Sequence, residues 1–333
     1  MRKSLKELSW DVSEEVYRAD SALSYSKLSQ FHKNGPKALI SNEKIDTPAL
    51  RFGSLVDCIL TAPEEFDDRF YVADIDRFSD TIRKIVEDLF NPEIESIGLI
   101  DDDTILMILD DYQYQTNWKS QTRIDKVISL GEDYYTVLKY STRKIVITQQ
   151  ELEEAQQCVQ TLRTHPFTYK IFECNRHQEI LYQLKFKTEI DNIPFRFMMD
   201  ICKVDYEQKT ILPIDLKTSG KSEEDFEKSF LDWCYWIQGG AYRTGLYKIT
   251  IEDNFFSDFM ILPFQFCVIN RNSLNPLIWE MDDKKTLKFT KEKYGTTWGQ
   301  ILEDANWHLQ NGKFDYSRKS YENKGINPIQ LKL

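Results

Sequence analysis

The chain has 333 residues, of which 41% are hydrophobic and 13% aromatic, with 12 glycines and 10 prolines. This length and composition exclude a disordered, collagen-like or low-complexity protein and allow about two domains of ordinary size. The formal net charge is −11, and residues 64–111 alone carry sixteen acidic and four basic side chains. The acidic excess is therefore local, and the rest of the chain is compatible with a neutral or basic groove that binds nucleic acid.

The amino terminus and the cysteines indicate the compartment. Residues 1–7 lack the apolar stretch of a signal peptide, and no run of about 18 apolar residues occurs in the sequence. We therefore expect a cytoplasmic protein that does not bind a membrane. The six cysteines include no Cys-x-x-Cys pair, so we expect neither zinc nor an iron–sulfur cluster.

The amino-terminal half has mainly helical patterns. A short helix is expected over residues 21–31, before the stop signal Gly35-Pro36, and an apolar helix over residues 54–62. Asp57 lies among apolar residues of that second helix, where a charge is costly unless it has a partner or a metal. Helices are also expected at 79–90 and 104–118, with linkers at 91–92 and 131–133, and a capping box at 148–151 is expected to open a helix that runs to 165.

The carboxy-terminal half changes to strand patterns after residue 174. Strands are expected at 178–187, 194–206, 210–218, 258–270 and 277–281, and helices after 222, at 233–248 and at 284–311. This order predicts the α/β class, with an α/β/α core built on a mixed sheet. We place that core at residues 151–333, after a mainly helical part at residues 1–150 that contributes Asp57.

The strand at 210–218 places a carboxylate and an ammonium together. Asp215 and Lys217 alternate with Ile214 and Leu216, so the two charged side chains share one face. Asp200 lies in the preceding apolar strand, and a hairpin between the strands makes the two aspartates neighbours. Adjacent carboxylates repel each other unless a divalent cation lies between them, and oxygen ligands suit Mg²⁺ or Mn²⁺.

Four other residues extend this candidate site. Glu179, one strand earlier, is expected to add a third carboxylate, and Asp57 a fourth. Gln238 and Tyr242 are spaced i, i+4 and share a helix face, with two glycines between them. Each glycine costs about 1 kcal/mol relative to alanine inside a helix, so we expect the close approach of another backbone or of a ligand there.

These residues resemble the signature of the PD-(D/E)xK nuclease superfamily, in which Asp200 would be followed by Asp215-Leu216-Lys217. The wider pattern also includes Phe52-Gly53 before Asp57, Glu179, and Gln238-Gly-Gly-Ala-Tyr242. Over about residues 21–247 it resembles the RecE-type, exodeoxyribonuclease VIII-like exonucleases of phages and prophages. Two departures are Met199, where the superfamily name expects proline, and Asp57, where many relatives have a metal-binding histidine.

The resemblance implies a role for each matching residue. Asp200, Asp215 and the backbone carbonyl of Leu216 would bind the metal, and Lys217 would position and help to deprotonate the attacking water. A depressed pKa of Lys217 would let it act as a base near neutral pH. Gln238 would hold the water, the lysine or a phosphate.

Two further residues are expected to contact the substrate. Tyr242 would pack or bond beside Gln238, and Arg51 lies next to the Phe52-Gly53 motif. Trp233, Tyr235 and Trp236 precede Gln238. We expect these three rings to pack against the sheet, and the alternative is that they stack on nucleobases.

The resemblance implies a metal-dependent DNA exonuclease that uses Mg²⁺ or Mn²⁺ and hydrolyses phosphodiester bonds at duplex ends. It would act in phage or prophage recombination, in the cytoplasm of a bacterial or phage-infected cell, beside a single-strand annealing protein, and is compatible with a homo-oligomeric ring. Two alternatives remain. One is a DNA endonuclease of the same fold acting on single strands, flaps or defence-related substrates, and the other is a catalytically silent DNA-binding module.

Overall fold

The computed structural model describes residues 2–41, 47–74, 78–327 and 329. The chain divides into two compact units, Met1–Gly53 with Cys158–Leu333, and Ser54–Gln157. Helices α3 (Pro48–Thr61) and α8 (Gln149–Thr164) each run from one unit into the other. The expected boundary after residue 150 lies within α8, and the first 53 residues fold with the unit that contains the sheet.

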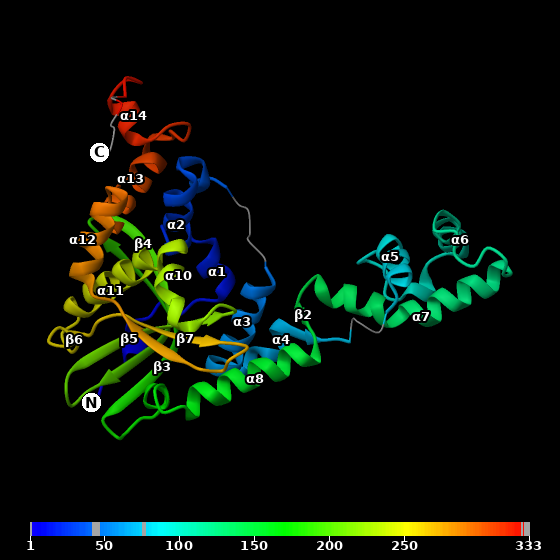
Figure 1. The fold of residues 1–333 in the computed structure, drawn as a ribbon, viewed down its shortest axis with the longest axis horizontal. Coiled ribbons are helices and arrows are strands. Elements are labelled where there is room, and N and C mark those ends of the chain that lie inside the picture. Colours follow the sequence, from blue (N-terminus) through cyan, green and yellow to red (C-terminus); the bar gives the residue numbers. More distant parts are fainter. Residues whose placement is uncertain (1, 42–46, 75–77, 328, 330–333) are drawn as a thin grey trace. The chain divides into compact units, whose positions relative to one another are not determined.

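A mixed sheet forms the centre of the first unit (Figure 1). Its strand order is β3-β4-β5-β7-β8, and β6 pairs with β5. The β3–β4, β4–β5 and β7–β8 pairs are antiparallel, whereas β5 is parallel to both β6 and β7. The strands are β3 (Gln178–Ile190), β4 (Ile193–Asp205), β5 (Thr210–Ser219), β6 (Met260–Ile261), β7 (Gln265–Asn270) and β8 (Leu277–Glu280).

Short turns set the register of the first three strands. Asp191 and Asn192 join β3 to β4 with φ values of 52° and 61°, the conformation that a two-residue hairpin requires. The expected strands at 178–187, 194–206 and 210–218 are therefore confirmed. The strand expected at 258–270 is instead two strands, because Pro263 lies between β6 and β7 and has no N–H to donate to a ladder.

Helices cover both faces of this sheet. Cys202 and Val204 of β4 belong to the core that contains the helix α11 (Tyr235–Ile251). The intervening Lys203 points to the opposite face, where its Nζ donates to the carbonyls of Lys170 and Glu173 at the short helix α9 (Tyr169–Phe172). The mixed α/β class and its mixed sheet are thus confirmed.

The other elements of the first unit are mainly helical. They are η1 (Leu5–Leu8), α1 (Glu14–Ala19), α2 (Tyr25–Asn34), η2 (Pro36–Leu39), α9 (Tyr169–Phe172), η5 (Glu223–Asp225), α10 (Phe226–Asp232), α11 (Tyr235–Ile251), α12 (Asp283–Tyr294), α13 (Trp298–Asn311) and α14 (Arg318–Glu322). Helices α2, α11 and α13 contact one another, and α11 lies against β3 and β4.

The helix expected at 284–311 is broken into two. Helix α12 ends at Gly295, which has φ 69°, and α13 begins after Thr297. Thr297 and Gln300 form a capping box, which satisfies the first amides of α13. A left-handed glycine followed by a new cap therefore ends one helix and starts another within a continuous amphipathic pattern.

The second unit is a helical body with its own apolar core. Its elements are η3 (Pro63–Glu65), α4 (Phe66–Arg69), β1 (Phe70–Val72), α5 (Asp80–Leu89), η4 (Ile97–Leu99), α6 (Asp102–Asp111), α7 (Ser120–Ser141) and β2 (Ile145–Ile147), with β1 parallel to β2. The linker expected at 131–133 is wrong, because Gly131 lies inside α7. A Cβ there would lie 2.6 Å from a methyl carbon of Val86, so this glycine permits close packing of α5 on α7.

No helix in the described part of the chain is both long and apolar enough to cross a membrane. Five of the six cysteines are buried free thiols, and Cys174 is exposed.

Candidate active site

Two aspartates meet where β4 and β5 separate. Ile201 pairs with Ile214, and the paired register of the two strands ends there. Beyond this pair, the next residue is Asp200 in β4 and Asp215 in β5. The backbone amide of Leu216 then donates to Oδ2 of Asp200 at 2.9 Å. The Asp200 carboxylate therefore accepts the backbone hydrogen bond that a continued β4–β5 ladder would otherwise provide for. The hairpin brings both acidic side chains to one cleft.

The strand on the other side of Asp200 has an unusual backbone. Gln183 of β3 lies opposite Asp200 of β4. Its two neighbours show this register, because Tyr182 pairs with Ile201 and Leu184 pairs with Met199. Its φ is 51°, a left-handed value that costs a non-glycine residue of order 1 kcal/mol. Such strain is found most often at functional sites, and here it adjoins the candidate ligand Asp200.

Asp215 is almost fully buried, with 3% of its surface exposed. Nζ of Lys217 lies 2.6 Å from its Oδ2, and Nε2 of Gln238 donates to its Oδ1. Because a buried carboxylate is stable only when charge and hydrogen bonds compensate it, these two side chains account for its presence in the core.

Lys217 is held as an ammonium. Burial lowers the pKa of Lys217, but the negative charges around it, chiefly Asp215 and also Asp200, raise that pKa above the ordinary value. Its Nζ also lies 4.4 Å from the ring centroid of Tyr235, a favourable cation–π distance. The direction of this pKa shift is opposite to the depressed pKa that the sequence analysis expected, because the charge of Asp215 outweighs burial.

Gln238 and Tyr242 lie one turn apart on α11 and both line the cleft. The Tyr242 ring contacts Phe195, Phe197 and Phe264. Burial raises the pKa of Tyr242 well above its ordinary value, so its hydroxyl stays protonated. Helix α11 therefore supplies an amide to Asp215 and a neutral hydroxyl to the cleft.

The cleft has a volume of about 740 Å³ and lies within the first unit. Five cationic side chains line it together with the two aspartates: Arg18, Lys27, Lys37, Arg196 and Lys217. Arg196 is 8% exposed, and its Nε has no hydrogen-bond partner among the described residues. An excess of buried and rim cations over carboxylates makes the cleft suitable for a polyanion.

The sequence-based prediction did not include the wall of the cleft that α2 and η2 form. Its cations are Lys27 of α2 and Lys37 of η2, and α2 adds the uncharged Ser26, Gln30 and Asn34. These last three are spaced four residues apart, so the polar stripe on one face of α2 is a signal that could have identified the wall.

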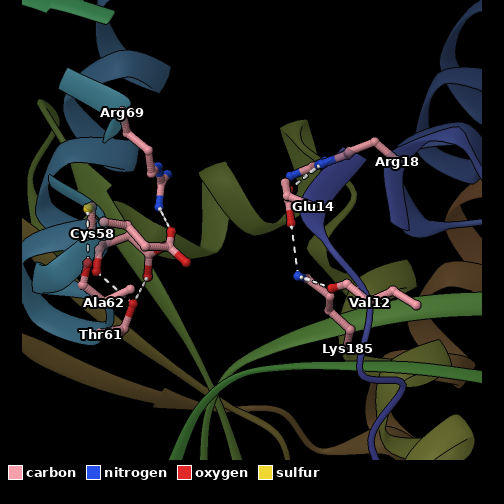
Figure 2. Close-up of polar contacts among 10 residues, drawn as sticks. Val12, Glu14, Arg18, Cys58, Thr61, Ala62, Arg69 and Lys185 are labelled. Atoms are coloured by element: carbon pink, nitrogen blue, oxygen red, sulfur yellow. Dashed lines mark hydrogen bonds and ion pairs between the residues drawn. The ribbon is translucent and has the colours of Figure 1, made fainter. Parts of the chain in front are cut away.

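Arg18 belongs to a chain of ion pairs, shown in Figure 2. Its Nε donates to Oε1 of Glu14 at 2.7 Å, and Nζ of Lys185 lies 3.7 Å from Oε2 of the same carboxylate. Nζ of Lys185 also donates to the carbonyl of Val12 at 2.9 Å. A positioned guanidinium has less side-chain entropy to lose when it binds an anion.

The acidic pair fits a hard divalent cation. Mg²⁺ is commonly held by one or two carboxylates with several waters, and Asp200, Asp215 and the Leu216 carbonyl offer such a set. Oε1 of Gln238 is buried beside them with no hydrogen-bond partner among the described residues. Within those same residues, no group of three or more His, Cys, Asp or Glu is placed to hold a metal. The two aspartates would therefore need water molecules and backbone oxygens to complete the coordination of a cation.

Glu179 does not join this pair. It pairs with Val204 in the β3–β4 register, four residues along β4 from Asp200, or about 13 Å away at the usual strand rise. Its carboxylate instead accepts from Ser4 at 2.9 Å and from the Tyr206 hydroxyl. The hairpin turn at Asp191 fixes the register, which explains why the expected third carboxylate is displaced.

Arg51 and Asp57 lie on α3. The side chain of Arg51 is exposed and is not among the residues that line the cleft. Asp57 belongs to the second unit, where the Thr61 hydroxyl donates to its backbone carbonyl at 2.8 Å, while Cys58 contacts the carbonyl of Ala62 (Figure 2). That Asp57 binds the metal stays a prediction.

The Phe52-Gly53 motif lies against the end of β5. A Cβ on Gly53 would lie 3.1 Å from Oγ1 of Thr218, and the guanidinium of Arg271 lies 4.5 Å from the Phe52 ring centroid. The glycine therefore lets α3 approach the strand that carries Asp215 and Lys217. Two motifs that are distant in the sequence meet at this contact.

Comparisons with known proteins identify the family of the domain. Residues 24–272 match the family model described as a PDDEXK-like domain of unknown function (DUF3799). No curated protein matches the chain. A solved structure named "Putative exonuclease", from Eubacterium rectale, is similar with a TM-score of 0.46 and 13% identity, over 97% of this chain and 96% of that one.

Proposed function

The chain belongs to the family of PDDEXK-like domains, and from this premise we propose that it is a metal-dependent deoxyribonuclease of the RecE type. It would hydrolyse phosphodiester bonds at duplex DNA ends, in phage or prophage recombination, with a single-strand annealing protein as partner. The observation that carries the proposal is the grouping of Asp200, Asp215, Lys217 and Gln238 in one cationic cleft.

The side chains of the cleft divide the work of hydrolysis. A divalent cation held by Asp200, Asp215 and the Leu216 carbonyl would polarise the scissile phosphate and a water molecule. The Lys217 ammonium is placed to orient the attacking water and to stabilise negative charge on a phosphate oxygen. The Gln238 amide holds the Asp215 carboxylate in position from the other side.

The rest of the cleft would bind the nucleic-acid backbone. Arg18, Arg196, Lys27 and Lys37 are distributed along its walls, and neutralisation of phosphates by such side chains is the sequence-independent part of DNA binding. The hydroxyl of Ser26 and the amides of Gln30 and Asn34 on α2 also line the cleft, and such groups are suited to phosphate contacts. A cleft of this kind binds a strand without selecting its sequence.

The test is digestion of linear duplex DNA labelled at its 5′ or 3′ end, beside circular DNA of the same sequence, in Mg²⁺, Mn²⁺ or EDTA. We expect loss of the linear form alone, only with metal, and early release of one label. Asp215→Ala is expected to abolish the reaction. Cutting of the circle would favour the endonuclease alternative, and metal-independent binding without digestion would favour a silent module.

A further inference from the structure

Trp233 departs from the packing that the sequence suggests for its aromatic cluster. Trp236 is 1% exposed and Tyr235 is half-buried, as expected for rings packed in the core. Trp233 is instead 54% exposed. It lies between α10 and α11, two residues before Tyr235, whose ring contacts the Lys217 ammonium.

Hydrogen bonds hold the backbone of Trp233 on both sides of its peptide unit. The amide of Trp233 donates to the Ser229 carbonyl at 2.9 Å, and the Trp233 carbonyl accepts from the Tyr25 hydroxyl at 2.7 Å. The following residue, Cys234, is left-handed with φ 58°, a conformation that is rare outside glycine. The ring is therefore presented from a fixed bend between two helices, with its backbone secured to α2.

A lysine lies against the ring. Nζ of Lys33 lies 4.6 Å from the Trp233 ring centroid. Lys33 directly precedes Asn34 on α2, and Asn34 lines the cleft, whereas Lys33 and Trp233 do not line it themselves. The two side chains therefore lie outside the cleft, at the rim formed by α2.

We propose that Trp233 and Lys33 form a stacking platform for one unpaired nucleobase of the strand in the cleft. Aromatic rings bind bases without sequence preference through their π-faces, and an adjacent lysine contacts the phosphate. The inference rests on the proposed nuclease function and deepens it. The strand that reaches Lys217 carries an unstacked base at this rim, so the site acts on an end that is opened or single-stranded.

The test is equilibrium binding of a short labelled single-stranded oligonucleotide in EDTA, where no metal-dependent cleavage occurs. Trp233→Ala is expected to weaken binding about 10-fold, and Trp233→Phe to keep most of the affinity, because the value of one stacked base corresponds to such a loss. Trp118→Ala is the matched control, since Trp118 is 42% exposed in the second unit, and we expect it to bind like the wild type.

A second ligand separates stacking from a structural effect. On a strand of abasic units, which keeps only sugars and phosphates, wild type and Trp233→Ala are expected to bind equally. If Trp233→Ala does not fold, 2-aminopurine in the oligonucleotide provides the same test, because stacking on the wild-type ring quenches its fluorescence.

The outcomes distinguish the platform from the nuclease. Equal affinity of wild type and Trp233→Ala for the normal strand, an undiminished difference on the abasic strand, or unquenched 2-aminopurine would overturn the platform alone. Stacking-dependent binding by a wild type that digests no DNA would support the platform and overturn the nuclease proposal. A wild type that binds no strand would overturn both.

Discussion

Asp215 is buried among apolar residues, and its environment sets the chemistry of the cleft. A buried carboxylate is destabilising unless neighbouring groups compensate it. Lys217 supplies the opposite charge and Gln238 a hydrogen bond. The Asp215 side chain also lines the cleft, so the protein keeps a compensated charge at the boundary between its core and the cleft.

Replacing Gln238 with leucine tests this compensation. The change removes the donor to Oδ1 of Asp215 at nearly constant volume, so we expect the free energy of unfolding to fall by about 1–3 kcal/mol. Urea denaturation measures it. The matched control is Gln265→Leu, whose amide donates to Glu280 at the surface, with an expected change below about 0.5 kcal/mol. Equal losses for the two variants would contradict the assigned role of Gln238.

The sequence predicted some site residues and missed others for identifiable reasons. Asp200 and Asp215 could be paired because both lie in apolar strands joined by a short connection. Glu179 was misplaced because its distance from Asp200 depends on a register that alternation alone does not determine. Arg18 and Arg196 give no local signal, since only the tertiary fold brings them to the cleft.

Helix α11 is shaped by glycines that admit large side chains from other elements. A Cβ on Gly239 would lie 2.8 Å from the sulfur of Met281, and one on Gly240 would lie 2.5 Å from the Trp298 ring. The sequence predicted a close approach here, by a backbone or a ligand. The structure assigns it to side chains, which anchor the helix that carries Gln238 and Tyr242.

Substitution of Gly240 tests this anchoring. Gly240→Ala improves helix propensity by about 1 kcal/mol, but overpacking against Trp298 is expected to cost about 1–3 kcal/mol. We therefore expect a lower melting temperature, measured by circular dichroism. Gly299→Ala is the control in α13, where an added Cβ meets no atom within 4 Å, and we expect an unchanged or higher value. A stabilised Gly240→Ala would refute the close contact.

At the level of elements, the sequence predicted the three-strand hairpin succession well because turn residues and alternation agree there. The prediction failed at glycines, because a glycine can either interrupt a helix or allow close packing inside one. Glycine at 131 indicated a linker but serves close packing inside α7, whereas Gly295 ends α12 within an uninterrupted apolar pattern. These outcomes depend on neighbours that are distant in the sequence.

Charge is distributed unequally between the two units. The second unit, residues 54–157, carries 23 acidic and 10 basic side chains, a net charge of −13, so the first unit sums to +2. Five of the cationic side chains of the first unit line the cleft, beside two aspartates. A protein with a net charge of −11 thereby keeps a local surface that is suited to DNA.

Salt dependence tests that surface. DNA affinity is expected to fall as salt concentration rises, and Lys37→Ala is expected to reduce the slope of log K against log salt by about 1, because one phosphate contact is lost. Fluorescence anisotropy over a salt series measures it. Lys319→Ala on α14 serves as the control, with the wild-type slope expected. An unchanged slope for Lys37→Ala would place the DNA elsewhere.

Whether Asp200, Asp215 and Lys217 form a nuclease centre is tested by the single-turnover rate of linear duplex cleavage in Mg²⁺. We expect Lys217→Ala to lower this rate by about 10²–10³-fold, the usual loss when one donor that stabilises developing charge is removed. Lys209→Ala, which removes an exposed ion pair with Asp258, should cleave like the wild type. Equal rates for Lys217→Ala and the wild type would show that Lys217 has no part in the reaction.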